Sequence, residues 1–196
     1  MQQRPQLRML FLVFACCLLF LSPLIIVMGP LFIPMTFYFE KNAWFYYSPS
    51  INYYLFAGVV VLLIAACLII LIGKMKWWAI TLSILLTIGA IVCVYGSATS
   101  YFKMTASGVT FSLPFSTEKN VYKWSEMEQF DYYSIDDNDT GRSYMIIYFK
   151  DGNSYQLSET AQIEGARSSM NAMFRANNVT IKYIDISDKE NNMQVE

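Results

Sequence analysis

The sequence changes character near Tyr101, where an almost wholly apolar half gives way to a polar one. Between residues 9 and 101 only four side chains carry a charge: Glu40, Lys41, Lys74 and Lys76. About 20 consecutive apolar residues suffice to cross a bilayer as a helix. The change therefore predicts a membrane region over residues 1–100 and a soluble domain over residues 101–187. The polar remainder, residues 188–196, is expected to be a disordered tail.

Three apolar stretches in the first half are long enough to be transmembrane helices: residues 9–28, 53–72 and 77–94. Gly29, Pro30 and Pro34 follow the first stretch, and we expect them to end its helix because proline removes a backbone donor. The basic turn at residues 73–76 predicts an antiparallel hairpin of the second and third helices. These helices carry small residues that favour close packing: Gly58, Ala65, Ala66, Ser83, Gly89 and Ala90.

The connection between the first two stretches, residues 32–54, is dense in aromatic side chains. Such rings lie at the headgroup level of a bilayer, with their apolar bodies inward and their polar tips toward water. We therefore expect an interfacial aromatic belt here. The alternative is a pocket or contact surface for lipid or a partner made from the same rings, with Trp44, Tyr46 and Tyr47 as candidate interaction residues.

The distribution of Lys and Arg predicts the orientation of the spans. An N-terminus in the cytoplasm places Arg4, Arg8, Lys74 and Lys76 there, whereas Lys41 and Lys103 lie on the opposite side. Short cytoplasmic loops carry the excess of basic residues. With three spans, this orientation puts the soluble domain outside the cytoplasm.

The second half alternates apolar and polar residues with period two, which is typical of strands. Strands are expected at residues 101–105, 109–113, 120–124, 129–135, 143–150, 154–157 and 179–186. Asp151-Gly152 is a hairpin sequence. A helix is expected after Ser158 or Thr160, because one apolar stripe recurs every three or four residues until Asn177. The second half is therefore expected to be an α+β domain.

The amino-acid composition limits the kinds of functional site that the chain can hold. The chain has no histidine, and its four cysteines all lie in the apolar stretches, so we expect no metal site, cofactor or catalytic group in the soluble half. That half holds nine basic and fourteen acidic residues, which disfavours nucleic acid as a partner. Asp131, Asp136 and Asp137 are candidates for an acid–base set, but carboxylates open to water are poor general acids near neutral pH. We therefore expect no enzymatic activity.

One acidic loop of the soluble half is a candidate interaction surface: Asp136, Asp137, Asn138 and Asp139. Three carboxylates and an amide also suggest calcium as an alternative ligand. The spacing differs from an EF-hand loop, because it lacks the glycine and the glutamate at their required positions. Exposed edge strands that accept an extended peptide are a further candidate surface.

The order of these elements resembles the bacterial pleckstrin-homology-like domains over about residues 101–178. The resemblance is carried by Tyr122-Lys123-Trp124-Ser125-Glu126-Met127, by the hairpin Tyr148-Phe149-Lys150-Asp151-Gly152 and by the single long helix. It implies an antiparallel sheet or partly open barrel with one C-terminal helix, acting as a binding scaffold. It also implies a cytoplasmic domain, opposite to the charge count. The strand expected at residues 179–186 departs from the family pattern.

Together these features predict a non-enzymatic, multi-pass protein of the bacterial inner membrane. Three transmembrane helices anchor a pleckstrin-homology-like module that binds a membrane or envelope protein at the bilayer surface, with the N-terminus cytoplasmic and the module extracytoplasmic. The alternative is a small accessory or immunity-type subunit of a larger membrane complex. That subunit would contact the complex through its spans and its aromatic connection.

Overall fold

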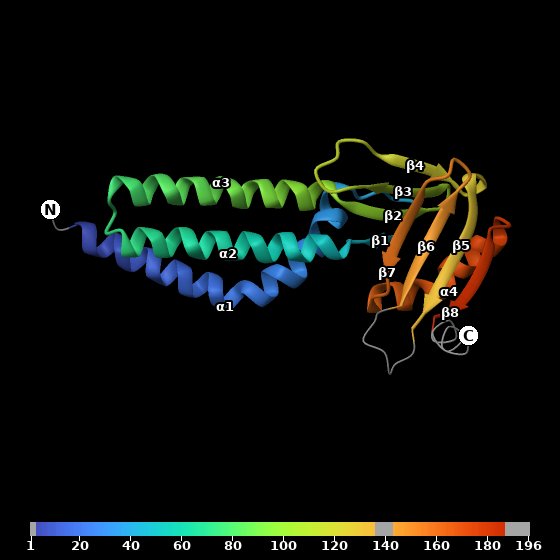
Figure 1. Cartoon of the computed structure of the whole chain (residues 1–196), viewed down its shortest axis with the longest axis horizontal. Helices are drawn as coiled ribbons and strands as arrows, with labels where there is room; N and C mark the ends of the chain where they lie inside the picture. Colours follow the sequence, from blue (N-terminus) through green and yellow to red (C-terminus); the bar gives the residue numbers. More distant parts are fainter. Residues whose placement is uncertain (1–2, 136–142, 187–196) are drawn as a thin grey trace, which may run out of the picture. The chain divides into compact units, whose positions relative to one another are not determined.

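The computed structural model describes residues 3–135 and 143–186 and divides the chain into two compact units (Figure 1). The first unit comprises Met1–Glu40, Ser48–Tyr101 and Ser112–Glu118, and the second comprises Lys41–Tyr47, Phe102–Phe111 and Lys119–Glu196. The chain leaves the first unit after Tyr101, and two short segments interleave. Residues 41–47 join the second unit and residues 112–118 join the first.

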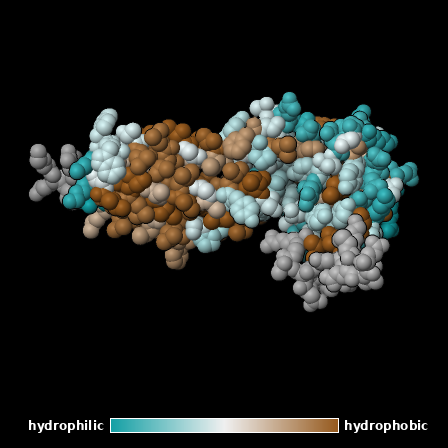
Figure 2. All heavy atoms as spheres, viewed as in Figure 1, coloured by the Kyte–Doolittle hydropathy of each residue, from teal (hydrophilic) through white to brown (hydrophobic). Residues whose placement is uncertain are grey.

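The first unit consists of three helices, α1 (Gln3–Phe37), α2 (Ser50–Ile72) and α3 (Trp77–Thr99). Each contains a stretch long and apolar enough to cross a membrane, which confirms the three apolar helices expected from the sequence. Helix α2 packs against both α1 and α3. Figure 2 shows hydrophobic residues over most of the visible surface of these helices, a surface suited to lipid.

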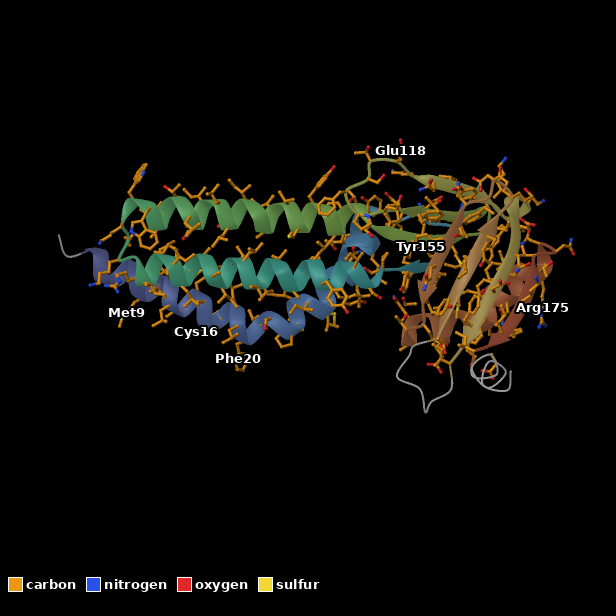
Figure 3. All side chains as sticks on the ribbon, viewed as in Figure 1. Met9, Cys16, Phe20, Glu118, Tyr155 and Arg175 are labelled. Atoms are coloured by element: carbon orange, nitrogen blue, oxygen red, sulfur yellow. The ribbon has the colours of Figure 1, made fainter. Side chains whose placement is uncertain are left out.

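Helix α1 is longer than the sequence indicated. The expected end of this helix at Gly29, Pro30 and Pro34 is wrong, because the helix continues to Phe37. Apolar helices tolerate proline by bending, and α1 bends near Phe20, shortly before Pro23 (Figure 3). Gly29 serves packing rather than termination, since a Cβ added there would lie 2.3 Å from Cε1 of Phe56 on α2.

Helices α2 and α3 form the expected antiparallel hairpin, with α3 extending to Thr99 rather than residue 94. Ala66, Ser83 and Ala90 are buried, and the Ser83 hydroxyl donates a hydrogen bond of 2.8 Å to the Ala66 carbonyl. The prediction that small residues pack these helices is confirmed. At the turn end of the hairpin, Arg8 of α1 donates to the Leu71 carbonyl at 3.2 Å.

The second unit holds two four-stranded sheets. Sheet A has the order β1-β2-β3-β4, formed by β1 (Ala43–Tyr47), β2 (Tyr101–Thr105), β3 (Gly108–Ser112) and β4 (Asn120–Lys123). Sheet B has the order β7-β6-β5-β8, formed by β5 (Met127–Ser134), β6 (Tyr144–Phe149), β7 (Ser154–Ser158) and β8 (Thr180–Asp185). A 3-10 turn, η1 (Trp124–Glu126), joins the sheets, and α4 (Ala161–Ala176) precedes β8.

Strand β1 comes from the aromatic connection between α1 and α2, where the sequence indicated an interfacial belt. It pairs antiparallel with β2, so that Phe45 lies opposite Met104 and Tyr47 opposite Phe102. Phe45 and Tyr47 are buried in the core of the second unit. The connection is therefore in part a strand of the α+β unit, because alternate rings gain more from burial in a core than at a surface.

Inward-facing residues of both sheets and of α4 form one hydrophobic core. Tyr155 lies between the sheets, stacked on Phe102 with ring centroids 5.0 Å apart (Figure 3). Phe174 of α4 stacks on Phe130 of β5 at 4.5 Å. Thr160 caps α4 by accepting a hydrogen bond from the Ile163 amide, as one of the two expected caps.

The last strand gives sheet B a mixed character. β8 runs parallel to β5, with Asp131 opposite Lys182, while all other described pairs are antiparallel. A parallel pair requires a crossover, and α4 supplies part of it. The observed architecture is thus three long apolar helices with antiparallel and mixed sheets and a C-terminal helix.

Candidate functional site

The two faces of sheet B differ in what they contact. Successive residues of a strand point to opposite faces, and Phe130, Tyr132, Met145 and Ile147 lie in the core beside α4. The opposite side, which we call the outer face of sheet B, carries Gln129, Asp131 and Tyr133 from β5 and Tyr144, Ile146 and Tyr148 from β6. Figure 1 shows β5 and β6 in front of α4, so this face is not covered by the helix.

Tyrosine rings dominate the outer face. Tyr133 lies directly opposite Tyr144 in the register, and their rings stack with centroids 4.7 Å apart and planes 15° from parallel. Cross-strand aromatic pairs of this kind stabilise a sheet. The pair also forms a rigid apolar surface with hydroxyl groups at its rim.

A hydrogen bond with Tyr148 raises the pKa of Tyr133 to about 12, with burial as the next cause. Tyr133 lies two residues beyond Asp131 on β5, whereas Tyr148 lies opposite Gln129, two residues before Asp131. The two tyrosines therefore flank Asp131 along the sheet, one on each side of it. We call Tyr133, Tyr148 and Asp131 the tyrosine-covered carboxylate.

Asp131 is only 4% exposed, although it lies on the outer face. Gln129 donates a hydrogen bond of 2.6 Å from Nε2 to Oδ1 of Asp131. Among the residues that the structure describes, no salt bridge to Asp131 is found, whereas Arg167 pairs with Glu159. Lys182 occupies the register position opposite Asp131 on β8, but its side chain is exposed.

A buried carboxylate with a neutral partner creates a negative potential at the sheet surface. Tyrosine rings beside it suit the aliphatic stem and the charged head of a lysine or arginine. Tyr is also enriched among residues that carry binding energy at protein interfaces. The arrangement can therefore hold a basic side chain, and it offers no group placed to activate a nucleophile.

A second polar cluster lies at the β6–β7 hairpin. The Tyr122 hydroxyl donates to Oδ2 of Asp151 at 2.8 Å, and Asn153 donates to both groups from Nδ2. The Asn153 amide, followed by Tyr122, holds the pKa of Asp151 below its usual value. A hollow of about 330 Å³ beside the cluster is lined by Val121, Tyr122, Glu126, Lys150 and Asp151. Because the polar groups satisfy one another, this cluster mainly fixes the hairpin.

A third cluster ties α4 to β5. The Arg167 guanidinium lies 4.3 Å from the ring centroid of Tyr132 and pairs with Glu159. The Tyr132 hydroxyl donates to Oε2 of Glu159 at 2.9 Å. Burial is the main cause that raises the pKa of Tyr132. These contacts hold α4 on β5, and the partly exposed Arg167 also borders a hollow of about 540 Å³ along α4.

The candidate residues from the sequence fall in three places. Trp44 is 37% exposed on β1, and Tyr46 is half-buried on the same side of that strand. Tyr47 is 2% exposed and packs edge-on against Phe102, so its ring lies in the core of the α+β unit rather than on its surface. Asp136, Asp137, Asn138 and Asp139 lie outside the described residues, as does the expected tail at residues 188–196.

Sequence reasoning missed the tyrosine-covered carboxylate. Its components are visible in the sequence as Tyr132-Tyr133 and as Tyr144 and Tyr148 in the next strand. The face on which each ring lies, however, depends on the register between β5 and β6. Within the described residues, no group of three or more His, Cys, Asp and Glu side chains is placed to hold a metal ion.

The sequence matches no protein-family model, and no curated protein matches it.

Proposed function

We propose that the chain is a non-enzymatic, multi-pass membrane protein whose α+β unit binds a protein partner at the membrane surface through the outer face of sheet B. The observation that carries this proposal is the tyrosine-covered carboxylate. Asp131 is 4% exposed and lies between two tyrosines on a sheet face that α4 does not cover. The partner presents a lysine or arginine, because an aromatic surface over a carboxylate binds that chemistry.

The partner's charge follows from composition as well. Residues 101–196 hold nine basic and fourteen acidic side chains. An acidic domain attracts basic partners and repels acidic ones, which raises the association rate for the former. The basic partner therefore meets a favourable field before it reaches the outer face.

The first unit supports insertion in a bilayer with the N-terminus in the cytoplasm. The hydrogen bond from Arg8 to the Leu71 carbonyl brings the beginning of α1 to the turn between α2 and α3. That end of the unit carries Arg8, Lys74 and Lys76. Basic residues gather on the cytoplasmic side, so the opposite end and the α+β unit lie outside.

The pairing of β1 with β2 supports an odd number of crossings, because it puts the ends of α1 and α3 on the same side of the membrane. β1 follows α1 and β2 follows α3, and paired strands lie on one side of a membrane. Helix α1 runs unbroken from Gln3 to Phe37, so it crosses once rather than folding back. Three crossings satisfy both observations.

A pleckstrin-homology-like fold for the second unit is supported by its two sheets and by the single helix that follows β7. The parallel strand β8 after this helix is an addition to that pattern. Such folds are scaffolds for many ligands, so the binding role rests on the outer face of sheet B rather than on the fold. A bacterial inner membrane is the location that the resemblance implies.

A photo-crosslinking experiment in cells tests the proposal. The photoreactive residue p-benzoylphenylalanine replaces Tyr144 on the outer face, and in a control chain it replaces Val121, which is 66% exposed on β4. We expect a protein adduct from position 144 and none from position 121. Asp131→Asn preserves the shape but removes the charge, and it should lower the adduct yield by about tenfold or more.

An adduct that is unchanged by Asp131→Asn contradicts a charge-based site. Hydrogen exchange of β5 and β6 amides checks that this variant keeps its fold. The accessory-subunit alternative predicts adducts from the spans and none from position 144. The small residues and rings named for that alternative are largely used within the chain, because Ala66, Ser83 and Ala90 pack α2 on α3 and Phe45 and Tyr47 fill the core.

A further inference from the structure

Residues 112–118, which are the last residue of β3 and most of the loop that leads to β4, belong to the helical unit rather than to the sheet that contains both strands. The Phe115 amide donates a hydrogen bond of 2.9 Å to the Thr99 hydroxyl at the end of α3. Its ring lies over Gly96, where an added Cβ would come within 2.3 Å of Cζ of Phe115. The loop is therefore seated on the last turn of α3.

Phe115 adopts this position at a conformational cost. Its φ angle is +60°, a left-handed conformation that is a genuine outlier for a bulky residue. Strained residues persist only where surrounding contacts hold them, and they gather at functional positions. Here the hydrogen bond to Thr99 and the contact with Gly96 hold the residue.

The seated loop still presents apolar side chains outward. Phe115 is 51% exposed and Leu113 is 54% exposed, so the described part of the chain leaves about half of each side chain uncovered. Strain that served folding alone would bury the ring. An apolar environment outside the chain accounts for both the strain and the exposure.

The position of the loop along the helices identifies that environment. Tyr38 after α1 stacks on Tyr101 after α3 at 3.9 Å, and Asn52 of α2 donates to the Ser100 carbonyl at 2.8 Å. The end of α1, the beginning of α2 and the end of α3 are therefore together. This end carries the exposed side chains Phe37, Phe39, Tyr54, Tyr95, Leu113 and Phe115.

We propose that Leu113 and Phe115 insert into the boundary between headgroups and acyl chains of the bilayer that the helices cross. They extend the aromatic belt with residues from the loop between strands β3 and β4 of sheet A. Tyr and Trp at the ends of transmembrane helices lie at this depth, and Phe and Leu of membrane-surface segments are buried at the same boundary. The inference rests on the membrane insertion in the proposed function, but it is independent of the partner-binding face.

Spin-label accessibility in liposomes tests the inference on the full chain with its four cysteines replaced by serine. Single labels are placed with Leu113→Cys and Phe115→Cys. Tyr95→Cys on α3 is the membrane reference, and Val121→Cys is the matched control because Val121 is apolar and 66% exposed on β4. Oxygen concentrates in lipid, whereas a nickel chelate stays in water. The ratio of the collision rates of the spin label with oxygen and with the chelate therefore reports how deeply the label lies in the bilayer. We expect the ratio at 113 and 115 to match that at 95 and to exceed that at 121.

Each other outcome has a distinct meaning. A water-like ratio at 113 and 115, with a lipid-like ratio at 95, overturns the inference and leaves membrane insertion intact. Protection of 113 and 115 from both reagents places them under protein and also overturns it. A water-like ratio at 95 contradicts membrane insertion itself. Gly96→Ala displaces the Phe115 ring, so it should shift the ratio at 113 toward that at 121.

Discussion

At the scale of single residues, Tyr133 reports directly on the tyrosine-covered carboxylate. The hydrogen bond with Tyr148 is the largest cause that raises the pKa of Tyr133 from 10.0 to about 12. Tyr148→Phe should lower this pKa toward 10.0, whereas Tyr144→Phe, which keeps that hydrogen bond, should change it little. NMR of ¹³Cζ-labelled tyrosine across pH measures both, with the resonance assigned by Tyr133→Phe.

The raised pKa of Tyr133 makes the stability of the folded protein depend on pH. A neutral phenol that is favoured in the folded state stabilises the protein below the unfolded pKa of 10.0. This contribution is lost as the pH rises from 10 toward 12. A wild-type chain and a Tyr148→Phe variant should therefore converge in stability at high pH. If Tyr133 had the same pKa in the wild-type chain and in the Tyr148→Phe variant, this result would contradict the hydrogen bond between Tyr133 and Tyr148.

Two glycines should respond in opposite directions to alanine. A Cβ at Gly108 would lie 2.0 Å from the Tyr122 carbonyl oxygen, so Gly108→Ala forces β3 away from β4 and should cost more than about 2 kcal/mol. Gly165 lies inside α4 with nothing within 4 Å of an added Cβ. Gly165→Ala should therefore stabilise by about 0.5–1 kcal/mol. Thermal unfolding in detergent micelles compares the two, and equal effects would argue against this β3–β4 register.

At the scale of elements, β1 decides whether the aromatic connection belongs to the sheet. Phe45→Ala removes a core side chain and should cost about 3–5 kcal/mol. Phe39→Ala alters the same residue type in the same connection, but Phe39 is 74% exposed, so we expect a change within about 0.5 kcal/mol. Hydrogen exchange of β2 and β3 peptides should accelerate only in the first variant. Equal exchange rates in the two variants would indicate that the connection is a surface belt and not a strand of the sheet.

The contrast between β1 and the later strands explains what sequence could predict. Residues 109–113 alternate apolar and polar side chains, and β3 was expected within one residue of its observed bounds. Ala43-Trp44-Phe45-Tyr46-Tyr47 contains no polar alternation, so its strand is invisible to a period-two pattern. Its partner, β2, lies some 60 residues away in sequence, and only tertiary packing shows that Phe45 and Tyr47 point into a core.

Helix α1 shows a second limit of local rules. Gly29, Pro30 and Pro34 are strong helix breakers in water, where a broken backbone can bond to solvent. An apolar helix lacks that option, so it bends and continues. The packing of Phe56 against Gly29 also stabilises the helical conformation of α1, and this contact depends on the presence of α2. Local sequence therefore predicted the apolar span but not its end.

At the scale of the whole molecule, the candidate site depends on strand register more than on any motif. The stacking of Tyr133 on Tyr144 joins residues on either side of the acidic loop, and the covering of Asp131 needs both β5 and β6 in place. Composition alone predicted an acidic soluble half without histidine. It could not indicate which of its fourteen carboxylates is buried on an outward face.

The proposed function depends most on three membrane crossings, which would put the α+β unit outside the cytoplasm. The test uses Gln156→Cys on β7 and Met75→Cys in the α2–α3 turn, each in a chain with the native cysteines replaced. Met75 is chosen because changing Lys74 or Lys76 would alter the charges that orient the spans. Each variant is treated with an impermeant thiol reagent in intact cells. We predict labelling of position 156 in intact cells and of position 75 only after lysis. Labelling of both positions, or of position 75 alone, in intact cells would contradict the account.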